Sequence, residues 1–269
     1  MRITARTRVF ALLGSPVAHS LSPRMQNAAF LAAGVDAVYV VLQPTAEGLG
    51  EQMRALVRGG GGGNVTVPFK EVAAQVAAAR EAVVAQLGSA NVFGGANGEM
   101  QLGNTDVDGI LAALDQLEVA NDPWCVIGTG GSARAVVGAA AIRGARIAVR
   151  SRDAERATAF SAWAASLGVQ RADLQDCAAV INATPVGLSA GDPPPLGVSL
   201  VPRDAAVLDL VYNTDGPTAW VRACTAIGVR ALDGREVLLA QGAASWRIWL
   251  PGVTPPLDVM RAALNGQLA

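Results

Sequence analysis

The amino-acid sequence predicts an α/β protein made of two consecutive α/β blocks and a helical tail. Short apolar segments typical of buried strands alternate with longer amphipathic segments typical of helices. This alternation indicates β-α-β units, in which helices cover both faces of a parallel sheet. With 269 residues, of which 51% are hydrophobic and 16% charged, the chain has enough apolar material for one or two folded domains.

The first block contains three predicted strands and two predicted helices. The strands are Arg8 to Leu13, Val38 to Leu42 and Asn64 to Val67, and the helices are Ser22 to Ala33, opened by Ser-Pro, and Glu47 to Arg58. Five glycines, Gly59 to Gly63, precede the third strand. Because glycine loses the most entropy on ordering, we expect this run to be a flexible connector, and we assign it no chemistry.

The second block shows the alternation more clearly. Its predicted strands are Trp124 to Ile127, Arg146 to Val149, Ala178 to Ala183 and Ala206 to Val211. Its predicted helices are Ser132 to Arg143, Asp153 to Leu167 and Thr218 to Ile227. The tail is predicted to be helical over Glu236 to Trp249 and Leu257 to Leu264.

Composition argues against several classes of protein. Charged residues or glycine interrupt every apolar stretch before it reaches the length of a membrane span, and the first residues do not have the pattern of a secretory signal. The net charge is -1 without a stripe of basic residues, so neither nucleic acid nor a membrane surface is an expected partner. Cys125, Cys177 and Cys224 are predicted to be buried free thiols, and His19 is the single histidine, so no metal site is expected. We expect a cytoplasmic protein.

A glycine-rich loop opens the second block. Gly128, Thr129, Gly130, Gly131, Ser132 and Ala133 follow one predicted strand and begin the next helix. This is the G-x-G-x-x-A context that binds a dinucleotide pyrophosphate: Gly128 makes the tight turn, Gly130 lets the backbone approach the phosphates, and Ala133 permits close helix packing. The free N–H groups and positive dipole of the helix N-terminus favour the same ligand.

The end of the next strand indicates which dinucleotide binds. NAD sites usually carry an acidic residue there, but this chain has Arg150, Ser151 and Arg152, with Asp153 only afterwards. Guanidinium groups pair well with a 2′-phosphate, which favours NADP, although a solvated basic helix start is the alternative. Asp153 either caps the following helix or weakens the preference by repelling the phosphate.

Three polar clusters lie in the first block, and each has a structural alternative. Asn64 to Lys70 places Thr66 and Lys70 around a strand end, where a lysine is usually just a solvated helix start. Thr105 or Asp106, in the segment Gly103 to Gly109, and Ser22, in the segment His19 to Pro23, are candidates for helix N-caps. His19 beside Ser20 does not by itself indicate a hydrolase, which needs an oriented third member.

Taken together and in order, these motifs resemble those of shikimate dehydrogenases. The resemblance includes Gly14 to Pro23, Asn64 to Lys70, Gly88 to Asn91, Asn104 to Asp106, the glycine loop with Arg134, Ser151-Arg152, Asn182 to Thr184, Asp209 to Tyr212 and Leu239 to Gly242. It covers nearly the whole chain, and the Asn64 to Lys70 stretch is its most specific part. Against this pattern, Val92 stands where threonine is common, Ser151 where asparagine is usual and Asp153 where threonine is usual.

The resemblance implies an enzyme of aromatic amino acid biosynthesis that interconverts 3-dehydroshikimate and shikimate with NADPH. It implies an N-terminal α/β substrate domain, residues 1–105, with C-terminal helices 236–269 returning to it, and a Rossmann-type NADP-binding domain, residues 106–235. Lys70 and Asp106 match the catalytic pair. The matching substrate ligands are Ser20, Ser22, Asn64, Thr66, Asn91, Tyr212 and Gln241. The matching cofactor residues are the six of the glycine loop, Arg150, Ser151, Arg152, Asn182, Thr184 and Gly234.

Three alternatives stay open at this point. An NAD-preferring quinate/shikimate dehydrogenase would share the same polar clusters; Arg150 and Arg152 argue against it and Asp153 weakly for it. A non-catalytic binding protein would be expected to lack Lys70 or Asp106, and both are present. A Rossmann enzyme for another substrate, such as an amino-acid-derived carboxylate, would need fewer hydroxyl-binding positions. The expected partner is a small-molecule substrate, and the chain is expected to be a monomer or homodimer.

Overall fold

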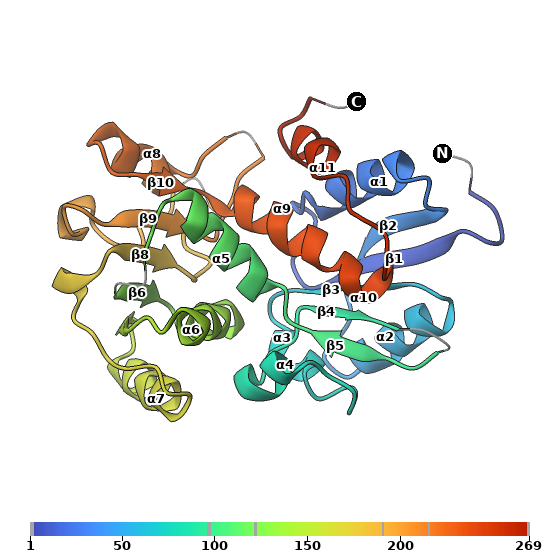
Figure 1. The fold of residues 1–269 in the computed structure, drawn as a ribbon, viewed down its shortest axis with the longest axis horizontal. Helices are drawn as coiled ribbons and strands as arrows, with labels where there is room; N and C mark the ends of the chain where they lie inside the picture. The colour runs from blue at the N-terminus through green and yellow to red at the C-terminus, as the bar shows by residue number, and fades with distance from the viewer. Residues whose placement is uncertain (1–2, 96–97, 121–122, 190, 215, 268–269) are drawn as a thin grey trace. The chain divides into compact units, whose positions relative to one another are not determined.

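A computed structural model gives the fold of the chain (Figure 1) and describes residues 3–95, 98–120, 123–189, 191–214 and 216–267. The chain divides into two compact units: the first comprises Met1–Thr105 and Leu238–Ala269, and the second comprises Asp106–Val237. Each unit is built around one five-stranded sheet with helices packed on it. This is the α/β class that the sequence predicts. No helix within the described residues is long and apolar enough to cross a membrane.

The sheet of the first unit has the strand order β2-β1-β3-β4-β5. Its strands are β1 (Arg8–Leu13), β2 (Ala37–Leu42), β3 (Gly62–Val65), β4 (Val92–Gly94) and β5 (Gln101–Gly103). β2 and β3 pair with β1 in parallel, whereas β4 pairs antiparallel with β3 and β5 antiparallel with β4. The predicted parallel β-α-β units are therefore present in β1, β2 and β3. The antiparallel strands β4 and β5 were not predicted, because three residues are too few to show a pattern.

The helices of the first unit come from both ends of the chain. They are α1 (Ser22–Ala32), α2 (Leu49–Arg58), α3 (Lys70–Ala73), α4 (Ala82–Leu87), α10 (Trp246–Trp249) and α11 (Leu257–Leu264). The C-terminal helices are held by aromatic packing, since Trp249 lies 5.1 Å from Phe10 and Trp246 lies 5.5 Å from Phe30, measured between ring centroids. Burial of these large rings ties the end of the chain to its beginning.

The glycine run is not a flexible connector. Gly62 and Gly63 belong to the central strand β3, and a Cβ added to Gly63 would lie 2.0 Å from the carbonyl oxygen of Ala11. A Cβ on Gly61 would lie 1.8 Å from the carbonyl oxygen of Val9. Side chains are excluded because β3 approaches β1 too closely, so these glycines are required by packing rather than by mobility.

The second unit has a fully parallel sheet of order β10-β9-β8-β6-β7. Its strands are β6 (Trp124–Ile127), β7 (Ile147–Arg150), β8 (Ala179–Asn182), β9 (Ala206–Asp209) and β10 (Ala231–Leu232). Its helices are α5 (Asp106–Gln116), α6 (Gly131–Arg143), α7 (Ala154–Ser166) and α8 (Ala219–Ala226), with short 3-10 turns at Leu174–Asp176 and Val198–Leu200. The boundary between the units falls within α9 (Gly234–Ala244).

The three cysteines are free and buried in the second unit, as the sequence predicts. Burial raises the pKa of the Cys125 thiol to about 12 and the pKa values of Cys177 and Cys224 to about 11. These thiols therefore stay protonated and serve the core as small apolar groups.

Candidate active site

Sheet topology gathers the polar motifs of the first unit at one edge. β1 and β3 are parallel neighbours, so the segments that follow them leave the sheet at the same edge. β4 starts at that edge because Val92 pairs with Asn64, and β5 ends there because Gly103 pairs with Val92. The segments carrying Ser20, Thr66, Lys70, Asn91 and Thr105 therefore all start from this edge.

Close backbone contact fixes the first two of these segments against each other. Ser15 N donates to the Val67 carbonyl at 3.0 Å, and Thr66 N donates to the Leu13 carbonyl at 2.8 Å. A Cβ at Gly14 would lie 2.3 Å from Cγ2 of Thr66, so only glycine permits this approach.

The two serines of the first motif lie at the start of α1. Leu21, not Ser22, occupies the N-cap position; Ser22 is the first helical residue and is 4% exposed, so the N-cap alternative for Ser22 was wrong. The Ser20 hydroxyl accepts from Ser22 N at 3.2 Å. This contact fixes the position of the half-buried Ser20 hydroxyl relative to Ser22.

Asn64 is a buried residue whose amide joins three segments of the first unit. Its Oδ1 accepts from the Tyr39 hydroxyl at 2.8 Å. Its Nδ2 donates to the Asn91 carbonyl at 3.1 Å and to Ser245 Oγ at 3.0 Å. Sequence reasoning missed Tyr39 and Ser245, since their partners are distant along the chain.

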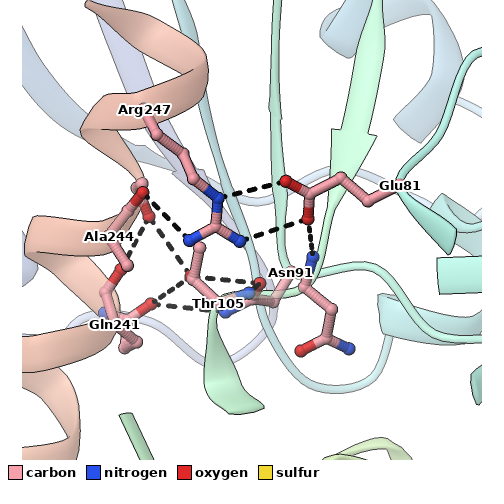
Figure 2. Close-up of polar contacts among 8 residues, drawn as sticks. Glu81, Asn91, Thr105, Gln241, Ala244 and Arg247 are labelled. Carbon is pink, nitrogen blue, oxygen red and sulfur yellow. Dashed lines mark hydrogen bonds and ion pairs between the residues drawn. The ribbon is translucent and has the colours of Figure 1, made fainter. Parts of the chain in front are cut away.

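Asn91, Thr105 and Gln241 form a buried polar cluster, which Figure 2 shows between the end of β5 and α9. Asn91 Oδ1 accepts from Thr105 N at 2.6 Å, and Asn91 Nδ2 lies 3.1 Å from Thr105 Oγ1 and 3.3 Å from Gln241 Oε1. Buried amides and hydroxyls are stable only when they are paired in this way. The cluster holds two of the predicted substrate ligands and Thr105, the residue directly before Asp106.

An ion pair between Arg247 and Glu81 contacts the segment that leads into this cluster. Arg247 donates to both carboxylate oxygens of Glu81, at 3.1 and 3.2 Å, and Glu81 Oε2 also accepts from Asn104 N at 3.3 Å (Figure 2). A bidentate arginine–carboxylate pair has a defined geometry. It links α10 to the chain immediately before Thr105 and Asp106.

Lys70 is the only lysine in the sequence, and arginine accounts for the rest of the 21 lysine and arginine residues. It is the first residue of α3 and is only 8% exposed, so the alternative of a solvated helix start does not fit. Its backbone carbonyl accepts from Ala90 N at 2.8 Å, which ties it to the segment that carries Asn91. Lysine can lose its proton whereas arginine cannot, so one lysine kept at a buried position favours proton chemistry.

The glycine loop of the second unit has the shape that a pyrophosphate requires. Gly128 has φ +114, and a Cβ there would lie 3.0 Å from the Ala183 carbonyl. An added Cβ at Gly130 would meet no atom of the described residues within 4 Å, so its backbone faces open space. Ala133, in the first turn of α6, is fully buried. These residues therefore fit a dinucleotide phosphate group at the N-terminus of α6.

Arg150 and Arg152 are exposed at the end of β7, beside the glycine loop: Gly128 N donates to the Arg150 carbonyl at 2.8 Å. Asp153 caps α7, since its Oδ1 accepts from Arg156 N at 3.1 Å. The capping alternative for Asp153 is thus confirmed. Ser151 Oγ accepts from Asp153 N at 3.2 Å, which orders the turn between the two arginines and the helix.

Asn182 and Thr184 organise the loop after β8. Asn182 is fully buried; its Nδ2 donates to Asp209 Oδ1 at 2.8 Å, and its Oδ1 accepts from the Thr184 hydroxyl at 2.7 Å. Gly234 is required by close packing, because a Cβ there would lie 2.3 Å from the Leu210 carbonyl. Tyr212 is half-buried in the loop that follows β9.

Asp209 is a buried carboxylate at the end of β9. It accepts from Asn182 Nδ2, from Val211 N at 3.1 Å and from the Thr218 hydroxyl at 2.7 Å. Burial raises the pKa of Asp209 to about 6, and these three hydrogen bonds oppose a larger rise. Asp209 therefore holds together the loops that carry Asn182, Tyr212 and Thr218.

The raised pKa of Asp209 predicts a pH dependence of stability. The folded state binds this proton up to about pH 6, whereas the unfolded chain releases it near 3.8. The stabilisation is complete below about pH 4, is lost as the pH rises through 6, and amounts to about 3 kcal/mol at most. Urea unfolding of the parent and Asp209→Asn should show their stability difference falling between pH 4 and pH 7. A difference that is constant or grows would mean that the hydrogen bonds dominate.

The site has no grouping typical of a metal centre: no cluster of three or more His, Cys, Asp or Glu residues occurs within the described residues. The functional groups that the two units offer are hydroxyls, amides, one buried lysine and a glycine loop at the N-terminus of a helix.

Comparison with known proteins decides the family. Residues 12–93 match the shikimate dehydrogenase substrate binding domain, and residues 234–264 match the shikimate 5′-dehydrogenase C-terminal domain. The shikimate dehydrogenase (NADP(+)) of Anaeromyxobacter sp. (strain K) is 37% identical over 97% of both chains. The chain belongs to the shikimate dehydrogenase family.

Further relatives extend this similarity over the whole chain. The shikimate dehydrogenase (NADP(+)) of Halobacterium salinarum is 37% identical, over 97% of this chain and 99% of its own. The crystal structure of shikimate 5-dehydrogenase from Thermus thermophilus, in complex with NADP(H) and shikimate, is 32% identical. It superposes with a TM-score of 0.87 over 97% of this chain and 100% of its own. The resemblance drawn from the sequence motifs is confirmed, and so is the two-domain α/β fold class.

Proposed function

We propose that this chain is an NADP-dependent shikimate dehydrogenase, which reversibly reduces 3-dehydroshikimate to shikimate. The observation that carries the proposal is the edge of the first sheet, where the only lysine, Lys70, lies buried on a segment bonded to that of Asn91. The full-length relatives are named for this activity with NADP(+). The first unit then binds the substrate and the second binds the cofactor. The enzyme works in the cytoplasm as a monomer or homodimer.

The substrate site suits a small ring with several hydroxyls and one carboxylate. Ser20 and Ser22 provide hydroxyls at the start of α1, and Asn64, Thr66, Asn91 and Gln241 provide amides and a further hydroxyl. Groups of this kind both donate and accept hydrogen bonds, as hydroxyls of the substrate require. A wrong polyol would leave buried amides unpaired, which is a strong penalty and gives specificity.

In this mechanism Lys70 handles the proton at the reacting oxygen. NADPH, when bound, supplies a hydride to the ketone carbon of 3-dehydroshikimate. The Lys70 ammonium stabilises the negative charge that develops on the oxygen and donates the proton that completes the hydroxyl. Asp106, directly after the tightly held Thr105, serves as the second member of the catalytic pair. In the direction of shikimate oxidation, neutral Lys70 accepts the hydroxyl proton.

Preference for NADP is assigned to Arg152, helped by Arg150. Both guanidinium groups are exposed beside the glycine loop, where the 2′-phosphate of NADP follows the pyrophosphate. The carboxylate of Asp153 is engaged with Arg156 N, so its first role is to cap α7.

A spectrophotometric assay tests this function. Purified protein mixed with shikimate and NADP should produce the absorbance of reduced nicotinamide, and quinate or NAD in place of either should give a slower reaction. Folded protein that gives no shikimate-dependent signal would disprove the proposal, and faster turnover with quinate and NAD would favour the alternative dehydrogenase.

A further inference from the structure

Ser245 lies at the junction of α9 and α10 and is completely buried. Within the first unit, its hydroxyl oxygen contacts the side chain of Asn64 on β3, the hydroxyl of Thr105 after β5 and the backbone carbonyl of Gln241 on α9. Two of these three residues are substrate ligands in the proposed function. We propose that Ser245 is a positioning residue, which sets the orientation of the substrate-binding amide of Asn64 and links it to the buried cluster of Asn91, Thr105 and Gln241. The role rests on the proposed function.

The hydrogen bonds of Ser245 have one consistent direction. A serine hydroxyl has a single proton and two acceptor lone pairs. The carbonyl of Gln241, 2.9 Å away, can only accept, so the Ser245 proton points to it. Ser245 Oγ then accepts from Asn64 Nδ2 at 3.0 Å. It is also one of three acceptors around the Thr105 hydroxyl, at 3.3 Å, beside Asn91 Oδ1 at 3.2 Å and Gln241 Oε1 at 3.4 Å. The proton of this hydroxyl and the lone pair that faces Asn64 are therefore both in use.

This direction determines what Asn64 offers to a ligand. Both hydrogens of Asn64 Nδ2 are taken, one by Ser245 Oγ and one by the Asn91 carbonyl. Oδ1 accepts from the Tyr39 hydroxyl and keeps a second lone pair. Asn64 Oδ1 therefore acts as a hydrogen-bond acceptor for a hydroxyl group of the substrate. Without Ser245, one Nδ2 hydrogen loses its acceptor and the amide loses part of its orientation.

The hydrogen bonds of the Gln241 side chain likewise determine what it offers to a ligand. Gln241 Oε1 accepts from Asn91 Nδ2 at 3.3 Å and lies 3.4 Å from the Thr105 hydroxyl. Gln241 Nε2 donates to the Leu238 carbonyl at 3.0 Å. One hydrogen of Gln241 Nε2 remains that no described residue accepts. Gln241 therefore meets the substrate as a donor, with its side-chain orientation fixed at Oε1 by Asn91 and Thr105.

Loss of the Ser245 hydroxyl should therefore affect substrate binding selectively. Asn64 Nδ2 would have a buried hydrogen without an acceptor, and the Asn64 amide would turn to find a new partner. Ser245 belongs to the first unit, whereas the glycine loop and Arg152 belong to the second. Affinity for shikimate should fall, while affinity for NADP should not.

Steady-state kinetics of Ser245→Ala, Ser245→Thr and Ser245→Cys test this role. We expect Ser245→Ala to raise the KM for shikimate about tenfold, with kcat changed less than about threefold and the KM for NADP less than about twofold. Ser245→Thr retains the hydroxyl, and in a helix threonine also bonds the carbonyl four residues earlier, so its shikimate KM should return to within about threefold of the parent. Ile248→Val, in the same short helix and outside the polar cluster, is the control for loss of packing alone, and its KM should be unchanged.

The outcomes distinguish a positioning role of Ser245 from a general loss of folding and from failure of the proposed dehydrogenase function. An unchanged shikimate KM in folded Ser245→Ala, or equal loss for shikimate and NADP, would overturn the role of Ser245. If Ser245→Ala does not fold, Ser245→Cys fills the same space with a weak acceptor; a raised shikimate KM supports the role and an unchanged KM overturns it. A parent protein that does not oxidise shikimate would overturn the proposed function, and the Ser245 role with it.

Discussion

Lys70→Ala is expected to lower kcat for shikimate oxidation about a hundredfold or more, with a much smaller change in the KM for shikimate. General acid–base catalysis by a positioned side chain contributes about 10²–10⁴-fold, and alanine removes both the proton carrier and its charge. Initial rates at saturating shikimate and NADP measure the effect, with thermal unfolding of the variant as the check on folding. Turnover within about threefold of the parent would make Lys70 structural.

Lys70→Arg separates proton transfer from charge. Arginine keeps the positive charge but stays protonated, so it stabilises the developing charge without exchanging the proton. A rate as low as that of Lys70→Ala would assign proton transfer to Lys70, and a substantial recovery would assign its effect to charge.

Because Lys70 is the only lysine, a lysine-selective acylating reagent modifies no other side-chain amine. Bound shikimate should slow that modification.

Arg152→Ala is expected to raise the KM for NADP about tenfold or more and to leave the KM for NAD nearly unchanged. A charge-assisted contact between guanidinium and phosphate is among the stronger hydrogen bonds. NAD has no 2′-phosphate, so its binding does not include this contact and should not depend on Arg152. Initial rates with each cofactor at saturating shikimate measure the two KM values. Equal losses for both cofactors would remove the main structural argument for NADP.

Asp153→Asn is the matched variant at the neighbouring exposed position. Asparagine can still accept the hydrogen bond from Arg156 N, so the cap of α7 is kept while the negative charge is removed. If the carboxylate repels the 2′-phosphate, the preference for NADP should sharpen. An unchanged preference would show that Asp153 serves the helix alone.

The fold could be predicted from the sequence where strands and helices show a strong local pattern. Arg8–Leu13, Trp124–Ile127 and Leu257–Leu264 have the predicted bounds, because each is a continuous apolar or amphipathic run between turn residues. The strands Val92–Gly94 and Gln101–Gly103 were missed because three residues show no period. Gly61 to Gly63 were misread because their packing against β1 depends on partners about 50 residues earlier.

The candidate site could be predicted only in part. The sequence motifs identified Asn64, Asn91 and Gln241. They did not identify the residues that hold these side chains in place, since Ser245, for example, lies 181 positions from Asn64 in the sequence. Tyr39 and Ser245 look like ordinary core residues when taken alone. One further signal was available and was not used: a chain that otherwise uses arginine for its positive charges has its single lysine at position 70.

The reduction of 3-dehydroshikimate by NADPH and NADH, compared at equal concentrations, tests the central claim most directly. In the proposed mechanism the ketone carbon takes the hydride, the oxygen takes the proton from Lys70, and the 2′-phosphate of NADPH pairs with Arg152. We expect kcat/KM with NADPH to exceed that with NADH by about tenfold or more, and Lys70→Ala to lose the reaction with either cofactor. Faster reduction with NADH, or a parent protein that leaves 3-dehydroshikimate unchanged, would contradict the assignment.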